Sequence, residues 1–297
     1  MIQIKDEMTE QFRKSFAANA KQRAVQHAVV KNGIANASET QEARVENTPV
    51  FSIDLATGKV TDQQRSGRCW MFAALNTFRH KMIGSFKLKD FELSQNYTLF
   101  WDKYEKANYF YENILATADQ DLESRKVAFL LQTPQQDGGQ WDMIVSLFKK
   151  YGVVPKTIMP ESRNSSNTQE LNKYLNKKLR KDAATLRGLV AAGESSQKIQ
   201  EQKTAMLADV YSFLSVSLGT PPQTFDFEYR DDDKRYHRDA GLTPLSFYEK
   251  YVGVDLDDYI SVINAPTADK PYNKTYTVEM LGNVVGGSPV KYLNVDM

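Results

Sequence analysis

The sequence is poor in the side chains that build disulfides, with one cysteine among its 297 residues. A single cysteine, Cys69, cannot form a disulfide within the chain, so nothing here calls for an oxidising compartment. Histidine and tryptophan are also scarce, with three of each. We predict no cofactor and no metal site.

Long apolar runs and an excess of one charge are absent too. The strongest apolar cluster, residues 127–131, is far too short to span a bilayer. The first 12 residues are acidic where a signal peptide would be basic and then apolar. Lysine plus arginine (38) nearly equals aspartate plus glutamate (37), which gives no reason to expect a nucleic acid or an anionic membrane as partner. Because 41% of the residues are apolar, a core can form, and we predict a cytoplasmic globular protein.

Helical periodicity is clearest at the N-terminus and in the middle of the chain. Apolar residues recur every fourth position over residues 8–30, which predicts a helix that ends at Gly33. Residues 34–68 are expected to be irregular, with short strands at Phe51, Ile53 and Val60. Further helices are expected over residues 69–82, 95–118, 122–132 and 141–150. Ser94 is the expected N-cap of the helix over residues 95–118.

The composition changes after residue 161. Residues 162–218 are rich in lysine, glutamine and serine, with apolar residues at helical intervals, and are interpreted as an inserted helical region. The charged run 230–235 is expected to be a solvated turn, and residues 242–252 a helix. Strand-like segments follow at residues 259–263, 276–280 and 290–295.

The segment from Gln63 to Phe72 carries the clearest chemical signal. At the first turn of a helix, unpaired N–H groups and the positive dipole end would stabilise a Cys69 thiolate, the reactive form of a nucleophilic cysteine. Gly67 would allow a tight turn before the helix and leave space for a substrate backbone. The side-chain amide of Gln63 can donate to a developing oxyanion, with the Cys69 N–H as second donor. A lone cysteine is otherwise more often a small buried hydrophobe.

Glutamine, five residues, then Cys-Trp-x-Phe at a helix start resembles the papain superfamily, and Ser-Gly-Arg-Cys-Trp resembles its aminopeptidase C and bleomycin hydrolase branch. The extra upstream cysteine of secreted papains is absent, as fits an intracellular member. Further similar segments follow in order, at residues 93–95, 137–141, 151–155, 270–274, 283–287 and 292–295.

The resemblance implies an α+β, papain-like cysteine proteinase fold. It implies a helical subdomain with the nucleophile in residues 1–161, an inserted helical or hook region in 162–241, and the incomplete start of a β-rich subdomain in 242–297. It also implies cysteine aminopeptidase activity on peptide substrates, and a hexamer in full-length relatives. Gly138 and Gly139 would hydrogen-bond an extended substrate backbone, although a glycine pair alone is as typical of a simple loop.

A papain-type mechanism also needs a histidine base and an asparagine that orients it. His80 lies eleven residues beyond Cys69 on the same expected helix, about 16 Å along its axis and out of reach. His27 belongs to the first helix, and His237 lies inside a charged cluster. No Asn-Ser-Trp segment follows.

We therefore expect the chain to stop before the histidine and asparagine half, and to have little or no peptidase activity alone. The alternative is a non-catalytic remnant or interaction module of the same fold. A nucleic-acid role, known for some relatives, is the least favoured reading because the net charge is close to zero.

Overall fold

The computed structural model describes residues 3–53, 55, 58–88 and 90–296. The chain forms two separate units, residues 1–55 and residues 56–297. The first unit is a series of helices: α1 (Asp6–Ala18), α2 (Ala20–Asn32), α3 (Ile34–Ser38) and α4 (Gln41–Glu46). None of its described residues is buried, so packing within this unit stabilises it little.

Three expectations for the first 68 residues are wrong in detail. Residues 34–68 are not irregular throughout, because the helices α3 and α4 lie within them. The single helix over residues 8–30 is broken at Asn19, whose backbone is extended and whose side chain accepts from the Gln22 N–H, capping α2. Gly33 does end α2, with a φ of 80°. The expected strands at Phe51, Ile53 and Val60 are not present, and these side chains are exposed. With no partner strand to complete a ladder, their apolar character does not produce a sheet.

The second unit begins with the helix that carries the cysteine. α5 (Cys69–Phe86) runs past the expected end at residue 82 and ends where Lys87 adopts a left-handed conformation, with a φ of 50°. The remaining helices of this part match the expected positions, with Ser94 capping α6 as predicted: α6 (Gln95–Ala116), α7 (Arg125–Gln132) and α8 (Trp141–Tyr151).

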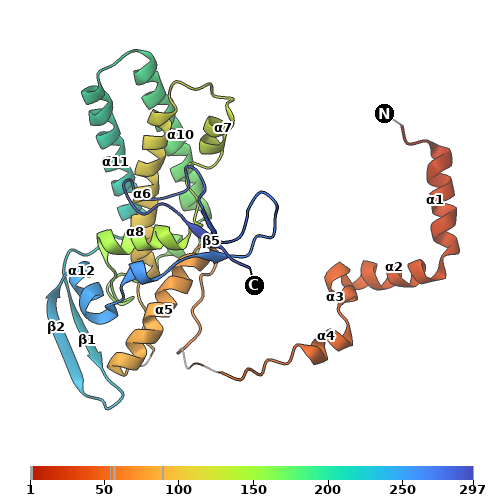
Figure 1. Ribbon diagram of the computed structural model, residues 1–297, viewed down its shortest axis with the longest axis horizontal. Helices are drawn as coiled ribbons and strands as arrows, with labels where there is room; N and C mark the ends of the chain where they lie inside the picture. The colour runs from red at the N-terminus through yellow and green to blue at the C-terminus, as the bar shows by residue number, and fades with distance from the viewer. Residues whose placement is uncertain (1–2, 54, 56–57, 89, 297) are drawn as a thin grey trace. The chain divides into compact units, whose positions relative to one another are not determined.

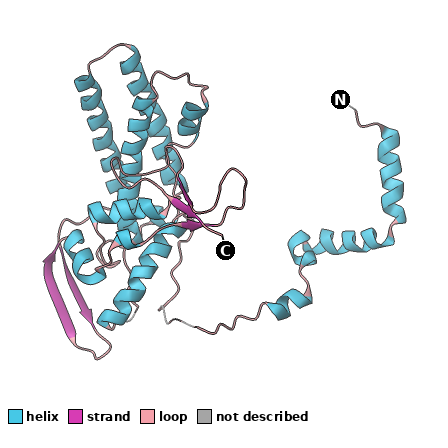
Figure 2. Ribbon diagram, in the orientation of Figure 1, coloured by secondary structure: helices cyan, strands magenta, loops and turns pink. Residues whose placement is uncertain are grey.

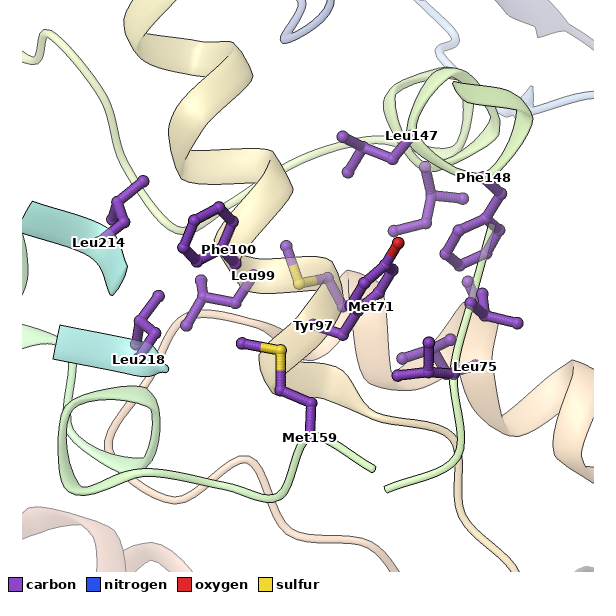
Figure 3. Packing of buried hydrophobic residues seen from close by; sticks show 14 of the residues in the cluster. Met71, Leu75, Tyr97, Leu99, Phe100, Leu147, Phe148, Met159, Leu214 and Leu218 are labelled. Carbon is purple, nitrogen blue, oxygen red and sulfur yellow. The ribbon is translucent and has the colours of Figure 1, made fainter. Parts of the chain in front are cut away.

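The hydrophobic core lies where α5, α6 and α8 meet α11 (Ser196–Leu218), and Figure 3 shows these side chains converging from separate elements. On α5 the buried residues recur at helical spacing, at Met71, Leu75, Phe78 and Met82. Each fully buried side chain of this size contributes about 1.5–3 kcal/mol to stability. The nucleophile helix is therefore a rigid element, which fixes the position of its first turn.

Residues 162–218 are helical, as predicted. They form α9 (Arg163–Ser166), α10 (Gln169–Ala191) and α11. α10 and α11 pack against α6 and each other, as the tall helical part of Figure 1 shows. The predicted divisions at residues 161/162 and 241/242 stay predictions about how the second unit is organised.

Strands occupy little of the chain, and Figure 2 shows them as one long hairpin and one small sheet. The hairpin pairs β1 (Phe225–Arg230) with β2 (Tyr236–Leu242), so the charged run is its turn. Three short helical elements follow: the α-helix α12 (Pro244–Phe247), the π-helix η1 (Tyr248–Val252) and the 3₁₀-helix η2 (Leu256–Asp258). The small sheet has the order β3 (Val262–Ile263), β5 (Tyr292–Asn294), β4 (Lys274–Tyr276), with β3 parallel and β4 antiparallel to β5.

Candidate active site

Cys69 is the first residue of α5, and its side chain is exposed. Arg68, at the N-cap, contributes no side-chain hydrogen bond to the helix end. No described residue accepts from the backbone N–H of Cys69. The start of α5 thus combines an exposed sulfur with backbone N–H groups that have no hydrogen-bond acceptor among the described residues, as the sequence predicted.

Gln63 lies in the loop that leads to this helix. Gln64, next to it, has a φ of 55°, and Asp62 stabilises that turn by accepting from both the backbone and the side chain of Gln64, at 2.7 Å each. Ser66 Oγ donates to the Gln63 carbonyl at 2.6 Å. The side-chain amide of Gln63 has no partner among the described residues, and its Oε1 is buried. Neither predicted oxyanion donor, the Cys69 N–H or the Gln63 amide, has a hydrogen-bond partner among the described residues.

Arg68, to which the sequence analysis assigned no role, stabilises the same loop through hydrogen bonds of its buried side chain. Its guanidinium is fully buried and donates two parallel hydrogen bonds of 3.0 Å to Glu161. Its Nε donates to Ser66 Oγ at 2.8 Å, which connects Glu161 to the Gln63 carbonyl. Because Glu161 is 93 residues away in the chain, spacing gave no signal for this pair.

Asp137 connects the cysteine helix to the glycine pair. Its Oδ2 accepts from the Gly67 N–H at 3.1 Å, and its Oδ1 accepts from Lys103 Nζ at 2.6 Å. Two further donors to this carboxylate are Thr168 Oγ1 and Asn172 Nδ2. Asp137 was part of a motif in the sequence analysis but had no assigned function.

The charges at this junction are strongly coupled. Burial by itself raises the pKa of the Asp137 carboxyl, but the Lys103 ammonium and the hydrogen bonds from Thr168 and Asn172 outweigh it and hold the pKa below its ordinary value. Burial lowers the pKa of Lys103 to about 8, although Asp137 opposes that shift. Near neutral pH the two groups form an ion pair.

Two of the glycines here, Gly67 and Gly139, are required by close contacts with side chains. A Cβ on Gly139 would lie 2.6 Å from ring carbons of Trp70, whose Nε1 donates to the Asp137 carbonyl at 2.7 Å. A Cβ on Gly67 would lie 2.9 Å from the Asp137 Cβ. The φ of Gly67 is not left-handed, so the reason for a glycine at this position is its close contact with the Asp137 side chain. Gly138 has open space where its Cβ would be.

A cavity of about 70 Å³ adjoins the glycine pair at Gly138. Phe110, Met143 and Met280 are among the apolar residues that line it, and Lys106 is among the polar ones. Elsewhere in the described part of the chain, no group of three histidine, cysteine, aspartate or glutamate side chains is placed to hold a metal ion.

Neither histidine of the unit that contains Cys69, His80 or His237, forms a hydrogen bond with its sulfur among the described residues. His80 is exposed on α5, and His27 is exposed on α2. His237 lies on β2, where its ring stacks on Tyr229 and its Nε2 is 2.9 Å from Asp231 Oδ2. That none of the three is the base stays a prediction made from the sequence.

Comparison with known proteins gives the family context for this geometry. The description "Peptidase C1-like family" matches residues 3–297. The chain belongs to this family. The predicted papain-like relationship and the α+β fold class are thereby confirmed.

The relatives of this peptidase C1-like chain are named as aminopeptidases. It is 59% identical to "Aminopeptidase C" of Streptococcus thermophilus over all of the chain and 67% of the relative. It is 55% identical to "Aminopeptidase C" of Lactococcus lactis over 99% of the chain and 66% of the relative. The crystal structure of PepW from Lactobacillus rhamnosis superposes with a TM-score of 0.97 at 61% identity, covering 99% of this chain and 66% of that one.

The chain therefore spans about two thirds of the length of the curated relatives it matches. The names of those relatives do not support the expectation that this chain is a truncated, inactive form, which stays a prediction. No helix in the described residues is both long and apolar enough to cross a membrane.

Proposed function

We propose that this chain carries the nucleophile and the substrate-binding backbone of a cysteine aminopeptidase acting on peptides in the cytoplasm. The observation that carries the proposal is the exposed Cys69 sulfur at the start of α5, beside uncommitted donors. The family membership and the names of the relatives support the same activity.

In the proposed reaction, the Cys69 thiolate attacks the carbonyl carbon of the first peptide bond. The Cys69 N–H and the Gln63 amide then donate to the oxyanion, where each such donor contributes about 10²–10³ in rate. The C–N bond breaks, the leaving nitrogen takes a proton from solvent water, and an acyl-enzyme thioester remains, which the resulting hydroxide hydrolyses to the free acid and the thiolate.

The substrate backbone is proposed to lie along the glycine pair. The backbone N–H and C=O of Gly139 form no hydrogen bond with any described residue, so they can pair with an extended peptide as a neighbouring strand would. Gly138, also predicted to bind substrate, is exposed and lines the adjoining cavity.

Neither His80 nor His237, the histidines of the unit that contains Cys69, contacts its sulfur among the described residues, and loss of the base of a triad costs several powers of ten in rate. We therefore expect little hydrolysis of an aminoacyl-amide fluorogenic substrate by this polypeptide alone, under reducing conditions, relative to a Cys69→Ala control. A robust rate that depends on Cys69 would contradict this expectation and turn attention to His237.

A labelling experiment tests the proposed site without needing a base. A dipeptidyl chloromethyl ketone with a free amino end and chloroacetone share one reactive group, but only the first carries a peptide backbone. We expect Cys69 to be alkylated at least about tenfold faster by the dipeptidyl reagent, since two backbone hydrogen bonds are worth about that much. Mass spectrometry of the intact chain follows both rates.

The second candidate is a non-catalytic interaction module, favoured by the absence of a histidine beside Cys69 among the described residues. It predicts equal rates with the two reagents. The hexamer of full-length relatives is carried over as a proposal for this chain, supported by the helices of residues 1–55, which expose apolar side chains such as Phe12 and Val30.

A further inference from the structure

The three backbone carbonyl groups just before Gly139 all accept hydrogen bonds from side chains. Lys106 Nζ donates to the Gln136 and Gly138 carbonyls at 2.8 Å each, and Trp70 Nε1 donates to the Asp137 carbonyl between them. Three successive carbonyls are thus bound to donors on α5 and α6. This arrangement fixes the segment and leaves the polar groups of Gly139 for a different partner.

Hydrogen bonds fix the position of the Lys106 ammonium. It is only 6% exposed, and its ammonium has three N–H donors for the three acceptors around it: the two carbonyls and Asp102 Oδ2 at 2.7 Å. The ammonium also lies 5.3 Å from the centre of the Trp70 ring. Any shift of this nitrogen would break a buried hydrogen bond.

Asp102 is in turn held by Asn283. Asp102 is fully buried, and its Oδ1 accepts from Asn283 Nδ2 at 3.0 Å. Asn283, itself 1% exposed, also donates to the Met143 carbonyl on α8. This gives a role to the first residue of the 283–287 segment, which the sequence analysis noted without assigning a function.

We propose that Lys106, held by Asp102 and Asn283, is a positioning residue that orients the Gly139 backbone toward substrate. The inference rests on the proposed function. A residue that only stabilised the fold would affect the two alkylating reagents equally, whereas a residue that orients Gly139 affects only the reagent with a peptide backbone.

The experiment compares Lys106→Met with the 297-residue wild-type chain, using the dipeptidyl chloromethyl ketone and chloroacetone at one pH. We expect the rate constant with the dipeptidyl reagent to fall about tenfold or more, because small displacements of a positioning group cost that much. The rate constant with chloroacetone is expected to change less than about twofold.

Two further variants separate positioning from folding. In Lys106→Met/Asp102→Asn no buried charge is left unpaired, so we expect the melting temperature to recover toward wild type while the dipeptidyl preference stays low. Lys203→Met is the matched control, since Lys203 is a mostly buried lysine that pairs with Glu112, farther along α6. It is expected to retain the wild-type preference.

The outcomes are distinct. If wild type itself shows no dipeptidyl preference, the proposed function and this inference both fail. If wild type shows it and the double variant retains it, or if Lys203→Met loses as much, the positioning role of Lys106 is overturned while the proposed function stands.

Discussion

Gly138 and Gly139 are neighbours in the chain but differ in what surrounds them. Gly138 has no heavy atom within 4 Å of the position of a Cβ, whereas a Cβ on Gly139 would overlap the Trp70 ring. Trp70 is in turn held by its hydrogen bond to the Asp137 carbonyl, so the ring cannot simply move away. At this scale, one residue of the pair is required by packing and the other is not.

Gly139→Ala is therefore expected to reduce the free energy of unfolding by about 1–3 kcal/mol, as an overpacked site does. Gly138→Ala, the matched control, should stay within about 0.5 kcal/mol of wild type. Urea denaturation followed by tryptophan fluorescence measures both. Equal destabilisation by the two changes would show that the Trp70 contact does not restrict residue 139.

α6 has a charged side that is buried. Asp102, Lys103 and Lys106 are each at most 6% exposed, although charged residues on a helix usually face solvent. Lys103 holds the Asp137 carboxylate, and Lys106 holds the carbonyls beside it. One element thereby supports both the loop before Cys69 and the segment that contains Gly139.

The pH dependence of stability should report on this pair. The folded pKa of Asp137 lies below its unfolded value of about 4, so its ionised form stabilises the fold above that pH, and the contribution is lost as the pH falls further. Asp137→Asn, which leaves Lys103 buried without its partner, should cost about 3 kcal/mol at pH 7.

The measurement is the difference in urea stability between wild type and the double variant Asp137→Asn/Lys103→Met at pH 7, 5 and 3.5, since removal of Lys103 as well leaves no unpaired ammonium that titrates in this range. The difference should be largest at pH 7 and shrink toward pH 3.5, because only wild type has this carboxyl to protonate. A difference that does not change with pH would contradict the ionised state assigned to Asp137.

At the scale of the whole molecule, the two units contribute unequally to stability. The second contains the hydrophobic core, and the first has no buried residue among those described. Several of its apolar side chains are largely exposed, including Val30 at 80%. Such surfaces commonly mark contacts with other molecules.

Deletion of residues 1–55 is expected to leave the urea midpoint of the remaining chain nearly unchanged, because the core is retained. The full chain should sediment as an oligomer at micromolar concentration, and the deletion variant should sediment as a smaller species. If both sediment alike, the first unit has no part in assembly, and the proposal of a hexamer through these helices fails.

The sequence by itself determined the family, the fold class, the cysteine at a helix start and most of the helices. These follow from local signals: apolar residues at helical spacing on α5, Ser94 as a cap, Gly33 as an end, and a motif compact enough to recognise. The break at Asn19 was missed because the apolar period continues across it.

Only the tertiary structure decided what holds the site together. Arg68 with Glu161, Asp137 with Gly67, and Lys106 with the Gly138 carbonyl join residues that are 32 to 93 positions apart. No periodicity relates such residues. Their charges are tolerated in the interior only because folding places an opposite charge or a carbonyl within hydrogen-bond distance, and sequence spacing does not encode that distance.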